Sequence, residues 1–399
     1  MRIGIDARLY GPRQGGLGRY LEQLIHGLEK TDQNNDYIVF LRQENFNDYI
    51  PENPRFKKIL ADIPWYGWRE QFCLPKILKR EKLDFIHFPH WNIPLFYKEK
   101  FVVTIHDLIL YHYPSRKAST LSPITYFLKN LTYKFVLHHS VKKAKYIFTP
   151  SEFTKQDIIN TLHIPADKIT VTYLAPTDLG IKFTPLNPAK PEFRDERNYL
   201  TGVNPVSSIK YTNGNVLSKH NITKPYLLYV GVAYPHKNLG RLVNAWKMFE
   251  EKNENFNLVL VGKKNYFYDR LINSDVFKQC KNIVFTDFVS DKELSELYQN
   301  ATAYIFPSLY EGFGLPPLEA MQYNIPVISS NTSCLPEILD ESVLYFNPQN
   351  EQDIYSKISM ILTQPEIRQK LINNIPNILA NYSQNNTSKI TLSVYQKMI

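Results

Sequence analysis

Residues Ser308-Leu-Tyr-Glu311-Gly-Phe-Gly314-Leu-Pro-Pro-Leu-Glu319-Ala-Met321 follow a short apolar run that is typical of the end of a buried strand. Their two glycines allow a sharp turn and a close approach of the backbone to a ligand. Their two prolines predict the start of a helix, where a missing N–H costs nothing. The free N–H groups and the dipole of a helix start favour an anion. We therefore expect an anion site with two acids at different depths of one cleft, Glu311 on the loop and Glu319 on the helix.

The rest of the chain alternates short apolar runs with amphipathic segments, and the segments 19–29 and 125–141 have helical patterns. Strands that alternate with helices indicate parallel sheets covered on both faces. The predicted fold class is therefore α/β, with two doubly wound Rossmann-like domains facing each other across a cleft. The predicted strands are 2–5, 37–41, 84–88, 101–105, 145–148, 169–173, 226–230, 257–261, 283–285, 303–306 and 326–329.

The domain boundaries follow from a change in composition. Residues 1–175 and 224–380 carry the two alternating patterns and are expected to form the two domains. Residues 176–223 are polar and rich in proline, which predicts a long linker or insertion. Residues 381–399 are expected to form a C-terminal helix that packs back on the first domain.

The composition excludes several classes of protein. The 399 residues carry a formal charge of +9, but the basic residues are scattered and no nucleic-acid-binding motif accompanies them. The three cysteines are widely spaced, which favours a reducing compartment without a disulfide framework or zinc site. A strand predicted from residue 2 leaves no room for a signal peptide, and no apolar run approaches the roughly 18 residues of a membrane span. We expect a cytoplasmic protein that binds no nucleic acid.

Two segments are candidates for contact with a membrane surface. They are Trp65-Tyr-Gly-Trp68 and the basic, aromatic stretch 126–145. Packing in the core is the expected role of the helix in the second stretch. The alternative is a protein held at the inner face of a membrane.

Three further motifs follow predicted strands. Gly15 and Gly16 precede a helix expected from Arg19 and can turn backbone amides toward an anion, although an ordinary turn explains them equally well. Lys237 stands at a helix start, where it can hold an anion or be an exposed surface lysine. His106 follows the strand 101–105, where it can donate to a ligand or be structural.

These motifs together resemble the retaining GT-B glycosyltransferases of family 4, also called glycosyl transferases group 1. Glu311 and Glu319 match the Glu-x7-Glu motif of that family, and Lys237 matches its phosphate-contacting lysine. His236 and Val232 stand where many relatives have arginines, so Lys237 is expected to neutralise the phosphates alone. The resemblance covers residues 3–20, the His106 segment, 151–154 and 226–347.

The resemblance implies a role for each matched residue. The first domain takes the acceptor and the second binds the nucleotide sugar. The catalytic residues are Glu311 on the sugar hydroxyls, Lys237 on the diphosphate and His106 on the sugar. Glu319 binds the ribose. The remaining donor-binding residues are Gly15, Gly16, Phe288, Val289, Ser308, Gly312, Phe313, Gly314 and Leu315.

The implied function is transfer of a sugar, with retention, from a nucleotide-sugar donor to a glycan or lipid-linked acceptor. The motifs most resemble bacterial-type mannosyl- and rhamnosyltransferases of polysaccharide assembly, which favours GDP-mannose. A UDP-sugar donor, a nucleotide-sugar epimerase and a catalytically silent sugar-nucleotide-binding protein are the alternatives. The sequence contains no Asp-x-Asp and no histidine–carboxylate spacing suited to a metal, so we expect no metal and no cofactor.

Overall fold

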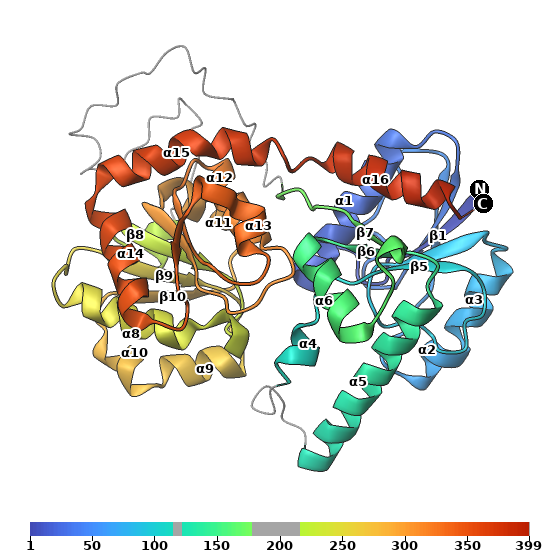
Figure 1. Ribbon diagram of the computed structural model, residues 1–399, viewed down its shortest axis with the longest axis horizontal. Coiled ribbons are helices and arrows are strands. Elements are labelled where there is room, and N and C mark those ends of the chain that lie inside the picture. Colours follow the sequence, from blue (N-terminus) through green and yellow to red (C-terminus); the bar gives the residue numbers. More distant parts are fainter. Residues whose placement is uncertain (115–121, 178–215, 399) are drawn as a thin grey trace, which may run out of the picture. The chain divides into compact units, whose positions relative to one another are not determined.

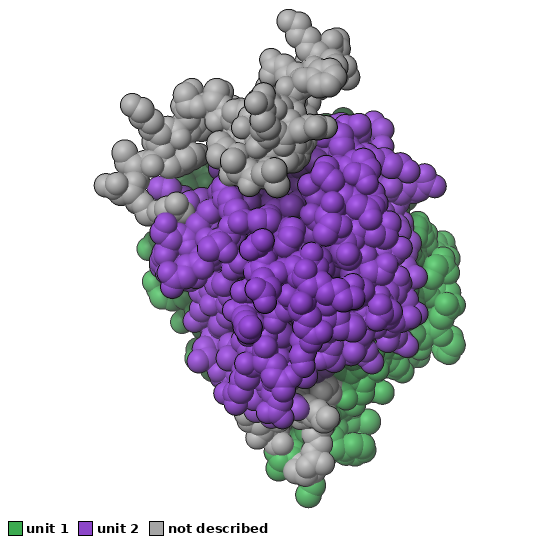
Figure 2. Space-filling model, turned by 90° about the vertical axis from the view of Figure 1, so that its left-hand side faces the viewer, with its two compact units in different colours: residues 1–175, 382–399 green, residues 176–381 purple. Residues whose placement is uncertain are grey.

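The computed structural model describes residues 1–114, 122–177 and 216–398. The chain forms two compact units (Figure 2), and each is described by itself. Unit 1 contains residues 1–175 and 382–399, and unit 2 contains residues 176–381. Most of the predicted linker, residues 178–215, lies outside the described residues.

Unit 1 is built on a parallel sheet (Figure 1). Its described strands have the order β3-β2-β1-β4-β5-β6-β7. Its core consists of apolar side chains such as Phe40, Val103 and Ile147, all fully buried. Its strands are β1 (Arg2–Asp6), β2 (Asp36–Leu41), β3 (Phe56–Leu60), β4 (Phe85–Phe88), β5 (Phe101–Thr104), β6 (Ile147–Thr149) and β7 (Ile169–Val171). Its helices are α1 (Gly15–Thr31), α2 (Trp68–Phe72), α3 (Leu74–Arg80), α4 (Ile109–His112), α5 (Pro123–Lys143), α6 (Glu152–Leu162) and α16 (Gln384–Gln396).

Unit 2 has a second parallel sheet, whose described strands run in the order β10-β9-β8-β11-β12-β13. Fully buried Leu227, Trp246 and Ile328 belong to its core. Its strands are β8 (Tyr226–Val230), β9 (Asn257–Val261), β10 (Ile283–Asp287), β11 (Ala303–Phe306), β12 (Val327–Ser330) and β13 (Leu344–Phe346). Its helices are α7 (Val216–Lys219), α8 (Leu239–Glu250), α9 (Tyr266–Ile272), α10 (Asp275–Gln279), α11 (Asp291–Asn300), α12 (Leu315–Gln322), α13 (Leu335–Leu339), α14 (Glu351–Thr363) and α15 (Pro365–Leu379).

In each unit the strand order reverses beside the first strand. In unit 1, β1 pairs with β2 on one side and with β4 on the other. In unit 2, β8 pairs with β9 and with β11 in the same way. Successive strands are therefore added on opposite sides of β1 and β8. Such a reversal is where doubly wound sheets bind ligands.

These two sheets confirm the predicted fold class of two Rossmann-like units. Every predicted strand run overlaps a strand, but β3 and β13 were not predicted. Both are edge strands, and β3 exposes part of its Phe-Lys-Lys-Ile-Leu run while β13 has only three residues. Helix α1 begins at Gly15 rather than Arg19, so the two glycines form its first turn instead of a preceding loop. That part of the prediction was wrong.

The last helix of the chain, α16, packs against α1 in unit 1 (Figure 1). Gln384 Nε2 donates a hydrogen bond to the carbonyl of Gln23 at 2.8 Å, and Thr387 Oγ1 donates to the carbonyl of Tyr173 at 2.5 Å. Tyr395 is fully buried, and its hydroxyl lies 2.6 Å from His87 Nδ1 on β4. The chain end therefore contributes side chains to the core of unit 1.

Close packing of Gly18 should make unit 1 sensitive to substitution there. A Cβ at Gly18 would lie 1.9 Å from the backbone carbonyl oxygen of Gly11, so the backbone must shift. We expect Gly18→Ala to lower the free energy of unfolding by about 1–3 kcal/mol, measured by urea denaturation. Gly16→Ala is the matched control, because nothing lies within 4 Å of its Cβ position. The control should change the free energy of unfolding by no more than about 1 kcal/mol. Equal stability of the two variants would show that Gly18 is not closely packed against Gly11.

Candidate active site

The candidate site in unit 2 lies where the strand order reverses. Lys237 follows β8 and Glu311 follows the neighbouring strand β11. Lys237 Nζ lies 2.5 Å from Glu311 Oε1, and the two side chains are only 16% and 10% exposed. The ammonium also lies 5.4 Å from the ring centroid of Phe306. Shielding from water strengthens this ion pair, but each partner keeps some access to solvent.

Lys237 is held in place by the residues on either side of it. The 3₁₀ turn Pro235–Lys237 ends at Asn238, which has a left-handed backbone with φ of 61°. Asn238 is buried, and its Nδ2 donates hydrogen bonds to the carbonyls of Pro307 at 3.1 Å and Pro348 at 2.7 Å. The segment after β8 is thus tied to the segment after β11, which brings Lys237 to Glu311.

The loop that carries Glu311 is fixed by hydroxyl groups at the end of β12 and just beyond it. Ser333 Oγ accepts a hydrogen bond from the backbone N–H of Glu311 at 3.1 Å. The hydroxyls of Ser330 and Thr332 donate to the carbonyl of Ser308 at 2.6 and 3.2 Å. The predicted site residue Ser308 is fully buried, and its own hydroxyl has no hydrogen-bond partner among the described residues. Sequence reasoning missed the three supporting hydroxyls, because no local pattern links them to Glu311.

Helix α12 begins as the double proline predicted. Gly314 precedes it with φ of 98°, and a Cβ there would lie 2.9 Å from Leu335 Cδ2, so the turn requires glycine. Glu319 projects from α12 and is buried, and its Oε2 accepts a hydrogen bond from the hydroxyl of Tyr298 at 3.5 Å. The two acids of the motif thus have different partners, Lys237 for Glu311 and Tyr298 for Glu319. The other predicted backbone donors, Gly312, Phe313 and Leu315, belong to this turn and the helix start.

The predicted base-binding residues follow β10. Phe288 is 73% exposed, whereas Val289 is buried. Asp287 has a positive φ of 62°, and its Oδ1 accepts hydrogen bonds from the backbone N–H groups of Lys264 and Phe288, each at 2.7 Å. This strained turn presents the Phe288 ring to solvent, where a flat base can stack on it.

In unit 1, His106 lies just beyond the end of β5. Its Nε2 donates a hydrogen bond to the carbonyl of Pro89 at 3.0 Å, because a carbonyl can only accept. Its ring makes an edge contact with Tyr20 of α1, with 4.7 Å between centroids. Burial lowers the pKa of His106 to about 4, so the ring is neutral near pH 7 and carries its lone pair on Nδ1. Gly15 and Gly16 open α1, and their Cβ positions face open space.

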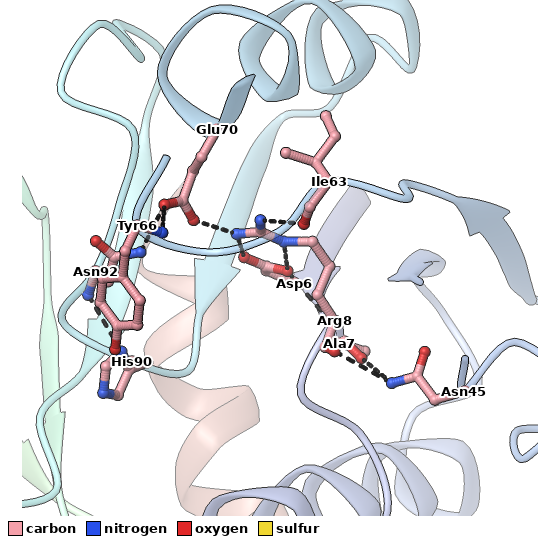
Figure 3. A network of polar contacts seen from close by, with 9 residues as sticks. All are labelled: Asp6, Ala7, Arg8, Asn45, Ile63, Tyr66, Glu70, His90 and Asn92. Atoms are coloured by element: carbon pink, nitrogen blue, oxygen red, sulfur yellow. Dashed lines mark hydrogen bonds and ion pairs between the residues drawn. The ribbon is translucent and has the colours of Figure 1, made fainter. Parts of the chain in front are cut away.

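A second polar group lies where the strand order of unit 1 reverses, and sequence reasoning missed it (Figure 3). Arg8 is fully buried and donates hydrogen bonds to both oxygens of Asp6 at 2.8 Å and to Glu70 Oε1 at 2.7 Å. Asn92 Nδ2 and the backbone N–H of Tyr66 donate to Glu70 Oε2, each at 2.8 Å. Burial lowers the pKa of Arg8, but the two carboxylates outweigh it and raise the pKa above its usual value.

This network joins three segments that are far apart in the sequence. Asp6 ends β1, Glu70 lies on α2, and Asn92 follows β4. Asp6 and Asn92, with Trp65 and His90, line a small hollow at the end of the sheet. Because removing one partner would leave a buried charge unpaired, the network fixes the shape of this edge. Asp6 at the end of the first strand, with Arg8 two residues later, was the available sequence signal.

Among the described residues, no group of three or more His, Cys, Asp or Glu side chains is placed to hold a metal ion. The absence of a metal requirement stays a prediction.

Two family models match the chain, one in each half. The model described as Glycosyltransferase Family 4 matches residues 14–175, and the model described as Glycosyl transferases group 1 matches residues 216–378. The two matched ranges do not overlap, and each falls on one of the two sheets.

Two curated relatives are similar over most of their length. The O-antigen chain mannosyltransferase RfbU of Salmonella typhimurium is 27% identical over 83% of this chain and 78% of its own. The O-antigen chain mannosyltransferase B of Escherichia coli is 28% identical over 89% of this chain and 88% of its own. Among solved structures, sucrose-phosphate synthase from Thermosynechococcus elongatus has the same fold, with a TM-score of 0.71 at 18% identity over 100% of this chain and 99% of its own.

The buried histidines of unit 1 should make it sensitive to acid. Burial, with His106 nearby, lowers the pKa of His87 to about 3, whereas an unfolded histidine has a pKa of about 6.5. As the pH falls below about 6.5, the unfolded chain binds a proton that folded unit 1 does not. Stability is therefore lost on acidification toward the folded pKa, at up to about 1.4 kcal/mol per pH unit for each such histidine.

We expect His87→Gln to reduce the slope of the unfolding free energy against pH between about pH 4 and pH 6. The reduction should correspond to one fewer proton bound on unfolding. The slope is informative even though the variant also loses hydrogen bonds at neutral pH. His26→Gln is the contrast, because a hydrogen bond with Glu29 raises the pKa of His26 above its unfolded value. Both states therefore carry this proton between about pH 4 and pH 6, and removing His26 should leave the slope in that range unchanged. An unchanged slope in His87→Gln would show that His87 is protonated in the folded state.

Proposed function

Because this chain belongs to the family 4 glycosyltransferases, we propose that it transfers mannose from GDP-mannose to a growing surface polysaccharide, on a glycan or lipid-linked acceptor. The chain is a hexosyltransferase of polysaccharide assembly, as its family and its relatives indicate. The choice of mannose is supported by relatives named mannosyltransferases that align with most of this chain. Guanosine is proposed on the motif resemblance alone.

The observation that carries this proposal is the shielded Lys237–Glu311 pair in unit 2. A diphosphate needs cationic and N–H donors at the position where charge develops as it departs. Lys237 supplies the cation, and the first turn of α12 supplies backbone N–H groups beside the same loop. In the absence of donor, Glu311 neutralises Lys237. With donor bound, we propose that Lys237 contacts the diphosphate and that Glu311 accepts hydrogen bonds from sugar hydroxyls.

The proposed reaction retains the anomeric configuration. The bond from the anomeric carbon to the diphosphate oxygen breaks, and the acceptor oxygen bonds to that carbon from the same face. The proton of the acceptor hydroxyl passes to the departing phosphate oxygen, and the nucleoside diphosphate leaves. Stabilising the departing diphosphate more than the intact donor lowers the barrier. This requires no carboxylate below the anomeric carbon, which fits a Glu311 paired with the phosphate-binding lysine.

The remaining predicted residues take the following proposed roles. Glu319 binds the ribose, and Phe288 with Val289 frames the base. In unit 1, Nδ1 of the neutral His106 accepts a hydrogen bond from a hydroxyl of the donor sugar. The open Cβ positions at Gly15 and Gly16 allow the diphosphate to approach the start of α1. We propose that no metal takes part.

Nucleotide binding provides the first test, by thermal unfolding with GDP, UDP, ADP and dTDP. At about 100 times its dissociation constant, a bound nucleotide stabilises the folded protein by about 2.7 kcal/mol. We expect GDP to raise the midpoint most, with and without EDTA. A larger effect of UDP would indicate a UDP-sugar donor, and loss of the effect in EDTA would indicate a metal. If none of the four nucleotides shifts the midpoint, the proposed site does not bind a donor.

Lys237→Met should reduce mannose transfer from GDP-mannose, because it removes the cation that stabilises the departing diphosphate. We expect kcat to fall by about 10²–10³-fold, as when one preorganised donor is removed from an oxyanion site. Glu311→Gln should also reduce transfer. For the parent chain, NMR of the product should show the α-anomer, because the proposed reaction retains the configuration of the donor. Lys278→Met, on the exposed surface of α10, is the matched control.

Two outcomes would overturn this assignment. Unchanged turnover in Lys237→Met and Glu311→Gln at saturating donor would place the chemistry elsewhere. An epimerised sugar formed from donor alone would instead identify a nucleotide-sugar epimerase.

A further inference from the structure

Helix α5 has two apolar faces, and unit 1 covers only one of them. Tyr133, Val136, Leu137 and Val141 point inward and are buried. The opposite side exposes five large apolar side chains, each 56–75% accessible: Ile124, Phe127, Leu128, Leu131 and Phe135. The core packing expected for this segment is therefore correct for one face and wrong for the other.

The exposed residues form a single stripe along α5. They recur at intervals of three and four residues, so they lie one above the other on a helix. The interval from Ile124 to Phe135 spans about 16 Å along the helix axis. An exposed helix face normally carries charged and polar side chains. This stripe has none between its apolar members.

The charges of α5 have one sign. Residues 123–143 include four lysines and two histidines but no aspartate or glutamate. The positive groups gather at the C-terminal end, where Lys142 and Lys143 are exposed. Lys168 adds its ammonium there, donating hydrogen bonds to the carbonyls of Val141 at 3.0 Å and Lys142 at 2.7 Å. The apolar stripe thus ends in a cationic cluster that has no acidic residue on the same helix.

A second exposed apolar group lies next in the sequence to Tyr66, whose ring is linked to α5 through Trp91. Trp68, Phe72 and Phe96 are 80%, 51% and 56% exposed and stack in sequence, with centroids 6.2 and 5.3 Å apart. Trp91 packs on Tyr133 of α5 with 4.8 Å between centroids. It also contacts Tyr66, two residues before Trp68.

We propose that the α5 stripe and this aromatic cluster dock unit 1 on the surface of a membrane that contains anionic phospholipid. Exposed aliphatic side chains enter the acyl boundary, Trp and Phe suit the headgroup level, and lysines meet the negative surface. A stable protein partner would bury about 800 Å² and 20–30 residues on each side, more than one narrow stripe offers. Among the described residues, no helix is long and apolar enough to cross a membrane.

The proposal does not rest on the sugar or the nucleotide, and its test uses neither. The full chain is mixed with vesicles of phosphatidylcholine alone, or of two parts phosphatidylcholine to one part phosphatidylglycerol, and bound protein is measured by sedimentation. We expect binding to the mixed vesicles that weakens with added salt. Phe127→Ser with Leu131→Ser should reduce the partition coefficient more than tenfold. Lys142→Glu should reduce binding to the anionic vesicles by about fivefold or more.

Ile50→Ser is the matched control, because Ile50 is 73% exposed in the segment between β2 and β3 of unit 1. It should bind vesicles like the parent chain, and all variants should keep the parent unfolding midpoint because their side chains are exposed. Vesicle binding that is unchanged in the double variant, or absent in the parent chain, would overturn the proposal. A parent dimer that the double variant converts to a monomer would overturn it as well, since a second copy would then cover the stripe.

Discussion

The reversal of strand order decides where the candidate side chains of both units lie. Parallel strands need crossover connections, so all their carboxyl ends meet at one edge of the sheet. Beside β1 and β8 the connections leave in opposite directions, which is the position where doubly wound sheets bind ligands. Lys237 and Glu311 follow one such pair in unit 2. In unit 1, Asp6 ends one strand of the pair and Asn92 follows the other. Residues distant in the sequence are thus brought together by topology.

The two units place charges at these positions with different consequences. Arg8, Asp6 and Glu70 are shielded almost completely, and every oxygen of the two acids accepts a hydrogen bond. Such a group holds its geometry, because any exchange of partner would uncover a buried charge. Lys237 and Glu311 keep part of their surface in solvent. Their pairing can be exchanged for a ligand at lower cost, which is the property required of a binding site.

The sequence predicted those features that depend on neighbouring residues. Continuous apolar runs such as Asn257–Val261 identified the buried strands, and Pro316 with Pro317 identified the start of α12. The ion pair between Lys237 and Glu311 spans 74 positions, and only the family resemblance placed both in one site. Glu70 and Ser333 were missed because their partners are fixed by the fold, not by spacing. Core packing was predicted for the outer face of α5, which is exposed, because the sequence pattern of an apolar face does not tell whether another part of the fold covers it.

The attachment of α16 to unit 1 has a consequence for the order in which the protein can be completed. The chain leaves unit 1 at residue 175 and returns at residue 382, so unit 2 is an insertion within unit 1. During synthesis the whole of unit 2 emerges before the last residues of unit 1. The buried hydrogen bond between His87 and Tyr395 closes only after residue 395 has been made, 308 positions after His87. Although synthesis of unit 1 begins first, its core acquires the contacts of α16 only after unit 2 has been synthesised.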